Sequence, residues 1–362
     1  MNYEAGSIAK FPIIINENLI DKVNDLVESN ISIAKESWNS NEISWGFQTL
    51  PFLFMDNTLR LSFLKFCNQI SDKYIQMKLQ EEELNRIVIE LYELSSELKS
   101  EIASNEIILY DDEINYNSIP SEGSIDNDKV PILKADAVIQ QLISYAIGCL
   151  MGRYKLSAPG LNIAHPSPSD EELKSYQFNN QDFLIDEDAI IPMMEIDSPF
   201  TDNVVNCFKY FLQVIWGEDT LTENINFVNT SLGMDIEKYL TEKFWDFHKK
   251  MYQKKPIYWL FTSPEGSFKV LTYMHRMDKF TVQKIRLNYL MRYIDFLRDK
   301  IQQAEANNEQ GRTIDKLRKA LTDCLEYDKI LKPLADQQIT FDLDDGVIVN
   351  YEKFKGAVAP LR

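Results

Sequence analysis

The residues best suited to chemistry lie between Lys243 and Lys300, where cationic and aromatic side chains are interleaved. This segment holds 13 Lys and Arg residues against five Asp and Glu residues, a net charge of +8. Cations attract phosphate groups and aromatic rings pack against bases or sugars, so this composition is typical of a nucleic-acid contact. The candidate DNA-contacting residues are Lys249, Lys250, Lys254, Lys255, Tyr258, Lys269, Tyr273, Arg276, Lys284, Arg286 and Arg292.

The same segment also has a purely structural interpretation. Ile257, Trp259 and Phe261 occupy alternate positions, as the buried face of a strand does. The cations that follow are equally typical of the solvated face of a helix. Composition alone therefore leaves both interpretations open.

The rest of the chain is strongly acidic. The net charge is −18, so the residues outside the basic segment carry −26. This balance argues against nonspecific affinity of the whole protein for DNA, because phosphate contacts need cations. The acidic surface either keeps the protein soluble, or excludes DNA from wrong registers and forms a partner interface. The basic segment argues against a third interpretation, an acidic mimic of DNA.

Sequence motifs for catalysis are missing. The chain contains no G-x-G-x-x-G, G-x-x-x-x-G-K-[ST], H-E-x-x-H or G-x-S-x-G motif, and no Asn/Asp-Pro-Pro-aromatic motif for methylation of an adenine amino group. Glu97-Leu98-Lys99 and Glu172-Leu173-Lys174 each match half of a nuclease centre, but Glu-x-Lys occurs often by chance. The three histidines are scattered, so we expect neither a metal site nor a catalytic residue in this chain.

Composition indicates an ordinary folded protein of the cytoplasm. Hydrophobic residues make up 44 % and charged residues 26 %. No apolar run approaches the ~20 residues that cross a bilayer, and the first ten residues lack a secretory pattern. The four cysteines lie far apart without a C-x-x-C pair, which indicates a reducing compartment. We therefore expect cytoplasmic localisation and no membrane partner.

Helical periodicity dominates the chain, with a small β part. Residues 1–103 are predicted to form an N-terminal connector and a long helical spacer or two-helix arm, with one helix beginning near Leu59. Residues 104–130 are acidic and contain Gly and Pro, which predicts a linker. Residues 131–362 are predicted to form a helical, target-recognition-like domain with a β-hairpin near 256–274. The expected fold class is mainly α with a minor β element.

Two further expectations concern loops and strands in residues 131–362. The polar, proline-rich stretch 166–199 is predicted to be a surface loop with short turns. Asp344-Asp345-Gly346 is predicted to be a turn that leads into a short last strand over Val347, Ile348 and Val349.

Six stretches of the sequence resemble one protein family. In chain order they are NYEAGSIAKFP (2–12), ISIAKESWNS (31–40), EEELNRIVIELYEL (81–94), ISYAIGCLMGRYKLSAPGL (143–161), KKPIYWLFTSPEGSFKVLTYMHR (254–276) and DLDDGVIVNYEKF (342–354). Together they resemble the C-terminal half of the PglX (BrxX) family, the adenine-specific DNA methyltransferases of BREX phage-defence systems. More distantly they resemble the C-terminal region of fused type IIG restriction–modification enzymes.

The resemblance implies a parent enzyme that transfers a methyl group from S-adenosylmethionine to adenine N6 in a defined DNA sequence. The family's donor-binding loop and Asn-Pro-Pro-Tyr motif lie upstream of the segment that matches residues 2–12. No catalytic or cofactor-binding residue is therefore carried over to this chain. We expect it to be inactive alone and to bind no cofactor, with S-adenosylmethionine bound by a separate catalytic domain. The chain is either an expressed fragment of such an enzyme or the product of a split gene, and the sequence leaves both alternatives open.

Two functions from different classes fit these observations. In the first, the chain is the non-catalytic target-recognition region of the methyltransferase, and its partners are double-stranded DNA and the catalytic half. In the second, it is an acidic helical scaffold that docks the catalytic half or other BREX proteins.

Overall fold

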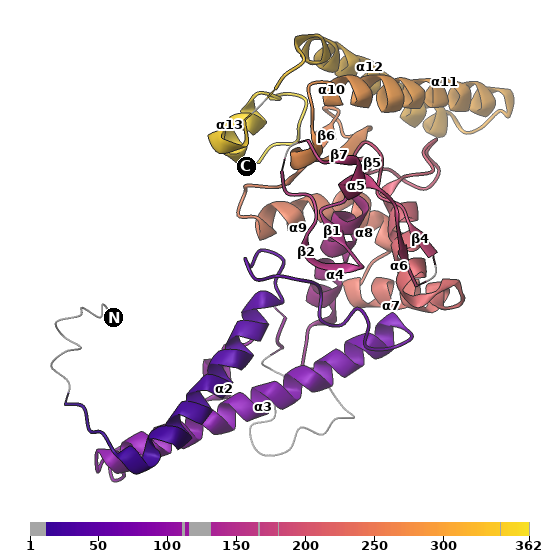
Figure 1. The fold of residues 1–362 in the computed structure, drawn as a ribbon. Helices are drawn as coiled ribbons and strands as arrows, with labels where there is room; N and C mark the ends of the chain where they lie inside the picture. Colours follow the sequence, from indigo (N-terminus) through magenta and orange to yellow (C-terminus); the bar gives the residue numbers. More distant parts are fainter. Residues whose placement is uncertain are drawn as a thin grey trace. The chain divides into compact units, whose positions relative to one another are not determined.

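The computed structural model describes residues 12–361 except 111–112, 116–131, 166, 180 and 341. Most of the linker predicted over 104–130 lies outside these described residues. Contacts between Cα atoms divide the chain into two compact units. Unit 1 comprises residues 1–46 and 63–134, and unit 2 comprises residues 47–62 and 135–362. The described chain is mostly helical with small antiparallel sheets of two or three strands, which confirms the predicted fold class (Figure 1).

Unit 1 is built on two antiparallel helices, α2 (Ile20–Asn39) and α3 (Leu59–Leu91). The first four residues of α3 belong to unit 2. Ion pairs join the two helices near both ends of α2, from Lys22 to Glu83 and from Lys73 to Glu36. Ile33 on α2 and Tyr74 on α3 are buried between these charged positions. The long predicted helix is present with 33 residues, about 50 Å at 1.5 Å per residue. Short 3-10 turns cover Glu17–Leu19 and Ser104–Glu106.

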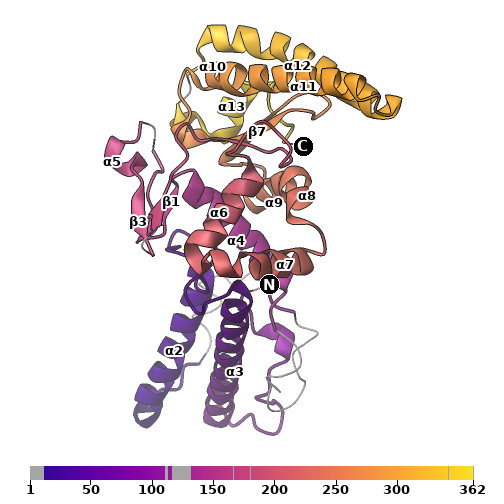
Figure 2. The ribbon, with the colours of Figure 1, turned by 90° about the vertical axis from the view of Figure 1, so that its right-hand side faces the viewer.

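The helical part of unit 2 surrounds α4 (Ala135–Leu150), which is buried from Val138 to Leu150 except at two glutamines. α6 (Val204–Trp216) and α7 (Leu221–Leu232) pack against it, as Figure 2 shows. Three shorter helices belong to the same unit: α5 (Asp170–Leu173), α8 (Ile236–Glu242) and α9 (Phe244–Met251). An aromatic group formed by Phe47, Tyr145 and Tyr154 ties residues 47–62 to α4.

The principal sheet of unit 2 has the order β5–β7–β6 and is antiparallel. β6 (Tyr258–Thr262) and β7 (Lys269–Tyr273) form the predicted hairpin, in which Tyr258 pairs with Tyr273. β5 (Ile190–Pro192) pairs with the other edge of β7. Two smaller hairpins are β1 (Tyr154–Lys155) with β2 (Ala158–Leu161), and β3 (Tyr176–Phe178) with β4 (Gln181–Phe183).

The prediction of a surface loop over 166–199 is therefore wrong in part, because this stretch holds β3, β4 and β5. Each strand has only three residues, which is too short for an alternating pattern to show in the sequence. β5 is stabilised by pairing with β7, whose residues come about 80 positions later in the chain. Such a long-range pairing leaves no local signal.

A helical layer covers the sheet and carries the end of the chain. It contains α10 (Thr281–Lys284), a π-helical segment (Ile285–Leu290), α11 (Met291–Ala306) and α12 (Gly311–Gln337). α11 and α12 lie side by side (Figures 1 and 2).

η4 (Glu218–Thr220), η5 (Met274–Arg276) and η7 (Leu343–Asp345) are short 3-10 turns. None of the helices in the described part of the chain is both long and apolar enough to cross a membrane.

The last predicted strand, over Val347–Val349, is wrong: these residues begin helix α13 (Val347–Glu352). Tyr351 and Phe354 are buried and pack edge-on against Trp259 at centroid distances of 5.2 and 5.7 Å. Ile348 and Val349 are exposed. Burial therefore follows the spacing of a helix, and this packing outweighs the β preference of the three β-branched residues.

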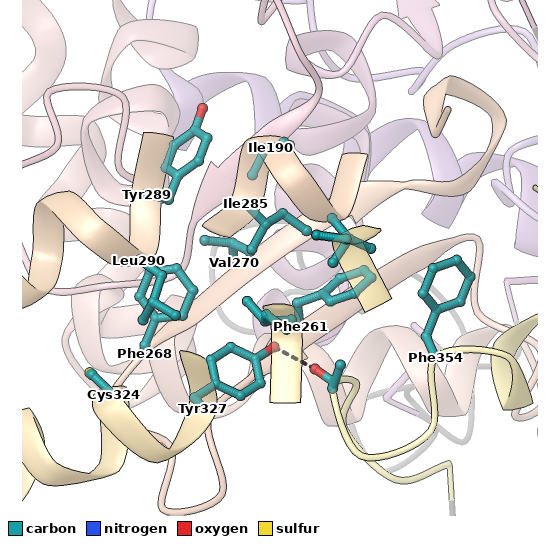
Figure 3. Packing of buried hydrophobic residues seen from close by; sticks show 14 of the residues in the cluster. Ile190, Phe261, Phe268, Val270, Ile285, Tyr289, Leu290, Cys324, Tyr327 and Phe354 are labelled. Carbon is teal, nitrogen blue, oxygen red and sulfur yellow. Dashed lines mark hydrogen bonds between the residues drawn. The ribbon is translucent and has the colours of Figure 1, made fainter. Parts of the chain in front are cut away.

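The C-terminal segment continues from α13 along the free edge of β6. Val358 pairs with Phe261, the Ala359 amide donates to the Leu260 carbonyl at 2.8 Å, and the Thr262 amide donates to the Ala357 carbonyl at 3.1 Å. The Tyr327 hydroxyl on α12 also donates to the Ala357 carbonyl, at 2.6 Å (Figure 3). The core of this part of unit 2 thus joins sheet, α10–α12 and C-terminal segment, as Figure 3 shows for its buried residues.

The turn between β6 and β7 is held by one carboxylate, Asp323 on α12. It accepts hydrogen bonds from the Ser263 hydroxyl at 2.6 Å and from the amides of Glu265 and Ser267 at 3.0 and 3.1 Å. Burial acts to raise the pKa of Asp323, but these hydrogen bonds outweigh it and leave the pKa below its usual value. The ionised carboxylate is therefore the form that the fold stabilises.

We expect Asp323→Asn to lower the free energy of unfolding by about 2–3 kcal/mol, because the NH2 group that replaces one carboxylate oxygen cannot accept the hydrogen bonds that this oxygen accepts. A lowered pKa contributes stability that is present above the unfolded value and is lost as the pH falls through the folded value. The difference between the two proteins should therefore narrow from about pH 5 towards about pH 3. Urea unfolding followed by tryptophan fluorescence measures the free energy of unfolding of both proteins. If their difference did not change with pH, the role of the Asp323 charge would be contradicted.

Candidate nucleic-acid interface

The structure separates the eleven predicted DNA-contacting residues into three groups, of which the first is buried. Tyr258 and Tyr273 are both fully buried as cross-strand partners in the hairpin. The Tyr258 ring stacks on His248 of α9 at 4.7 Å, and the Tyr273 hydroxyl donates to the carbonyl of Ile163. Neither ring is available at the surface of this conformation. The hairpin therefore serves as a core element here, in line with the structural interpretation of its alternating residues.

The second group consists of cations that are already bound within the protein. Lys269 donates to the Thr241 carbonyl at 3.1 Å, and Arg276 donates to the carbonyls of Asp186 and Glu187, both at 2.7 Å. Four others have a charged or aromatic partner: Lys249 with Asp246, Lys284 with Asp278, Arg286 with Asp328, and Arg292 with the ring of Phe200. Three of these six cations are thus paired with a carboxylate, and the other three are held by carbonyl groups or an aromatic ring.

The third group is Lys250, Lys254 and Lys255, which are exposed at the C-terminal end of α9 and just after it. Within the part of the chain that the structure describes, none of the three takes part in an ion pair. Cations near the end of a helix are also favourable for the helix dipole, typically by 0.3–1 kcal/mol. That effect is confined to the last turn of α9 and so does not explain Lys254 and Lys255.

The turn that carries these lysines has a defined and strained backbone. Gln253 and Lys254 have φ values of 50° and 63°, in the left-handed region that residues other than glycine rarely adopt. The Lys254 amide donates to the Lys249 carbonyl at 2.8 Å, and the Lys255 amide donates to the Tyr252 carbonyl at 2.8 Å. Two successive residues in this conformation cost roughly 1–2 kcal/mol each. The surrounding structure must therefore hold the turn in place.

His248 provides one of these restraints. Its Nε2 atom accepts the amide of Tyr258 at 3.1 Å, which links α9 directly to the start of β6. Burial and the nearby charge of Arg153 lower the pKa of His248 to about 3, so the ring stays neutral and remains an acceptor at neutral pH. Hydrogen bonds thus anchor the segment from Lys249 to Ile257 at its start, on the Lys249 carbonyl, and at its end, through the Tyr258 amide.

A groove lies between this turn and the C-terminal segment. It has a volume of about 730 Å³ and is lined by Gln253 and Lys254 on one side and by residues of α13 and 355–361 on the other. The second side contributes Lys355, which is exposed and only loosely paired with Glu352 at 3.7 Å. Lys355 was not among the sequence candidates. It lies outside the basic segment, and only the fold brings it to Lys254.

Two features with possible chemistry elsewhere have structural explanations. Glu172, from one of the Glu-x-Lys pairs, closes a capping box with Ser169 at the start of α5 and pairs with His165. Asp186 and Asp188 form a partly buried acidic pair, and burial followed by the charge of Asp188 raises the pKa of Asp186 to about 7. Their oxygens accept the Ile190 amide that begins β5. Among the described residues no group of three or more His, Cys, Asp or Glu is arranged to hold a metal ion.

Three large apolar side chains that are close in the sequence are exposed in unit 1. Trp38 and Trp45 are 71 % and 104 % exposed, and Ile43 between them is 46 % exposed. Exposed apolar surface commonly marks contacts with another protein. This is the type of surface that the scaffold alternative requires, and docking remains a prediction.

Comparison with known proteins places the chain among relatives of one enzymatic class, the adenine-specific methyltransferases. The chain is 34 % identical over 386 residues to the adenine-specific methyltransferase BrxX of Escherichia coli O9:H4 (strain HS), which covers 100 % of this chain and 31 % of that protein. It is 32 % identical over 380 residues to the adenine-specific methyltransferase PglX of Lacticaseibacillus casei (strain Zhang). This similarity covers 98 % of this chain and 29 % of that protein. No family model matches the chain.

These similarities confirm the resemblance inferred from the sequence. The chain spans only about a third of the length of the curated relatives it matches. The similarity extends across both units rather than being confined to one of them.

Proposed function

We propose that this chain is the non-catalytic DNA target-recognition region of an S-adenosylmethionine-dependent adenine-N6 methyltransferase of BREX-type phage defence. The observation that carries the proposal is the end of α9 and the turn after it, where Lys250, Lys254 and Lys255 are exposed in an otherwise acidic protein. Both relatives are named for methylation of adenine, and the chain lacks the Asn/Asp-Pro-Pro-aromatic motif for that reaction. A region that fixes register on the flanking duplex complements a catalytic region that flips the target base.

The proposal predicts weak, salt-sensitive binding of the chain to duplex DNA. With three or four lysine–phosphate contacts, the slope of log K against log salt concentration should be about −3 to −4. The Kd should lie in the micromolar range at low salt, as expected for contacts made mainly to phosphates. Fluorescence anisotropy with a labelled duplex at several salt concentrations measures both quantities. Absence of binding at low salt and tens of micromolar protein would count against a role in DNA recognition.

A further inference from the structure

We propose that the groove between the turn after α9 and the C-terminal segment holds the phosphodiester backbone of DNA, with Lys254 and Lys355 as the cations of its two sides. This inference rests on the proposed function and deepens it by naming which part of DNA the groove receives. The two lysines come from separate segments and line the same 730 Å³ groove.

The backbone of the groove side that carries Lys254 is ordered in the absence of a ligand. Gln253 and Lys254 are held in the left-handed conformation by backbone hydrogen bonds to Lys250 and Lys249, at 3.0 and 2.8 Å. The bond from the Tyr258 amide to His248 closes the same segment at its far end. A binding element that is already ordered loses little conformational entropy when its ligand binds. The strained turn is thus suited to present Lys254 and Lys255 in a fixed position.

The side that carries Lys355 is equally well fixed. The Tyr351 hydroxyl donates to the Ala359 carbonyl and the Tyr327 hydroxyl to the Ala357 carbonyl, while Ala357–Ala359 pairs with β6. Lys355 itself points into solvent, with its side chain 82 % exposed. Its nearest carboxylate, on Glu352, is 62 % exposed, so water weakens that pair and leaves the lysine available.

The chemistry of the lining residues favours phosphate over base edges. Lysine acts as a compact point charge, whereas arginine offers the planar fork that reads guanine. The cations that line the groove are lysines, and Val358, Ala359, Pro360 and Leu361 add apolar surface; its other polar side chains are Gln253, Tyr351 and Glu352, of which Tyr351 donates to the Ala359 carbonyl and Glu352 pairs with Lys355. Contacts to phosphates position a protein on DNA but carry no sequence information. The groove should therefore contribute to affinity equally on every duplex.

The test uses the full chain carrying Lys254→Glu, Lys355→Glu or both, with duplexes of two unrelated sequences. Each single change should lower affinity about tenfold at low salt and reduce the salt slope by ~0.9, equally on both duplexes. The matched control is Arg312→Glu, which changes the net charge by the same amount. Arg312 is exposed in the first turn of α12, fifteen residues before Tyr327, or about 22 Å along the helix. Its affinity should change less than about twofold.

The outcomes separate this inference from the proposed function. If the unaltered chain binds duplex DNA and Lys355→Glu binds as well as Arg312→Glu does, the groove is not the contact, although the proposed function stands. A loss limited to one of the two sequences would show that the groove reads bases and would overturn the assignment to phosphate. If the unaltered chain binds no duplex, the proposed function fails and the groove assignment fails with it.

Discussion

Replacement of Lys249, Lys250, Lys254 and Lys255 together by glutamate is expected to weaken duplex binding by at least ~100-fold at about 0.15 M salt. At this salt concentration a single lysine–phosphate contact contributes about fivefold to affinity. Loss of three or four contacts therefore accounts for the whole of the expected change, and repulsion by the new carboxylates adds to it. Anisotropy titrations of the variant and the unaltered chain under identical conditions provide the measurement.

The control for this variant must alter the net charge by the same amount at other sites. Arg298, Arg312, Arg318 and Lys329 lie on α11 and α12, and three of them pair with exposed acidic residues. Exposed pairs of this kind contribute about 0–1 kcal/mol to stability, so their reversal should leave the fold intact. If both quadruple variants lost affinity equally, net charge and not the turn after α9 would govern binding.

Replacement of Trp259 by alanine is expected to lower the free energy of unfolding by about 4 kcal/mol. Trp259 is fully buried, and its ring contacts Tyr351 of α13 and Phe354 just after this helix. Its indole N–H also donates to the Pro256 carbonyl at 3.1 Å, so truncation removes a hydrogen bond as well as apolar contact. The resulting cavity lies between β6 and α13, and neighbouring rings can fill it only in part.

Urea unfolding monitored by circular dichroism measures this loss. Trp45→Ala is the matched control, because the same side chain is removed from a site that is 104 % exposed. It should change stability by less than about 0.5 kcal/mol. A loss below about 1 kcal/mol for Trp259→Ala would mean that the contact between β6 and the C-terminal segment is not a significant part of the core.

Local sequence patterns identified the elements whose signals lie within a few residues. The hairpin of β6 and β7 was predicted because Pro264-Glu265-Gly266 separates two β-rich stretches, and α3 was predicted because its apolar positions recur over many turns. The pattern failed for α13, where three β-branched residues precede the two aromatic residues that set the helical packing. It also failed for β5, which has no alternating pattern of its own.

The candidate interface was predicted less completely than the fold, for a physical reason. The sequence shows where cations are concentrated but not which of them are neutralised by distant carboxylates. Arg286 is paired with Asp328, 42 residues later, and Lys300 with Asp197, 103 residues earlier. The burial of Tyr258 depends on α9 folding back against the hairpin, and the position of Lys355 depends on the return of the C-terminal segment. These relations exist only in three dimensions.

The pairing of Ala357–Ala359 with β6 has a consequence for self-association. A strand edge with unpaired amides and carbonyls is a template for strands of other molecules, and β6 carries the aromatic residues Tyr258, Trp259 and Phe261. The final residues act as a cover for this edge. Proteolytic cleavage after Phe354 would therefore do more than remove one side of the groove. It would turn a protein of net charge −18, whose repulsion opposes clustering, into one with an aggregation-prone edge.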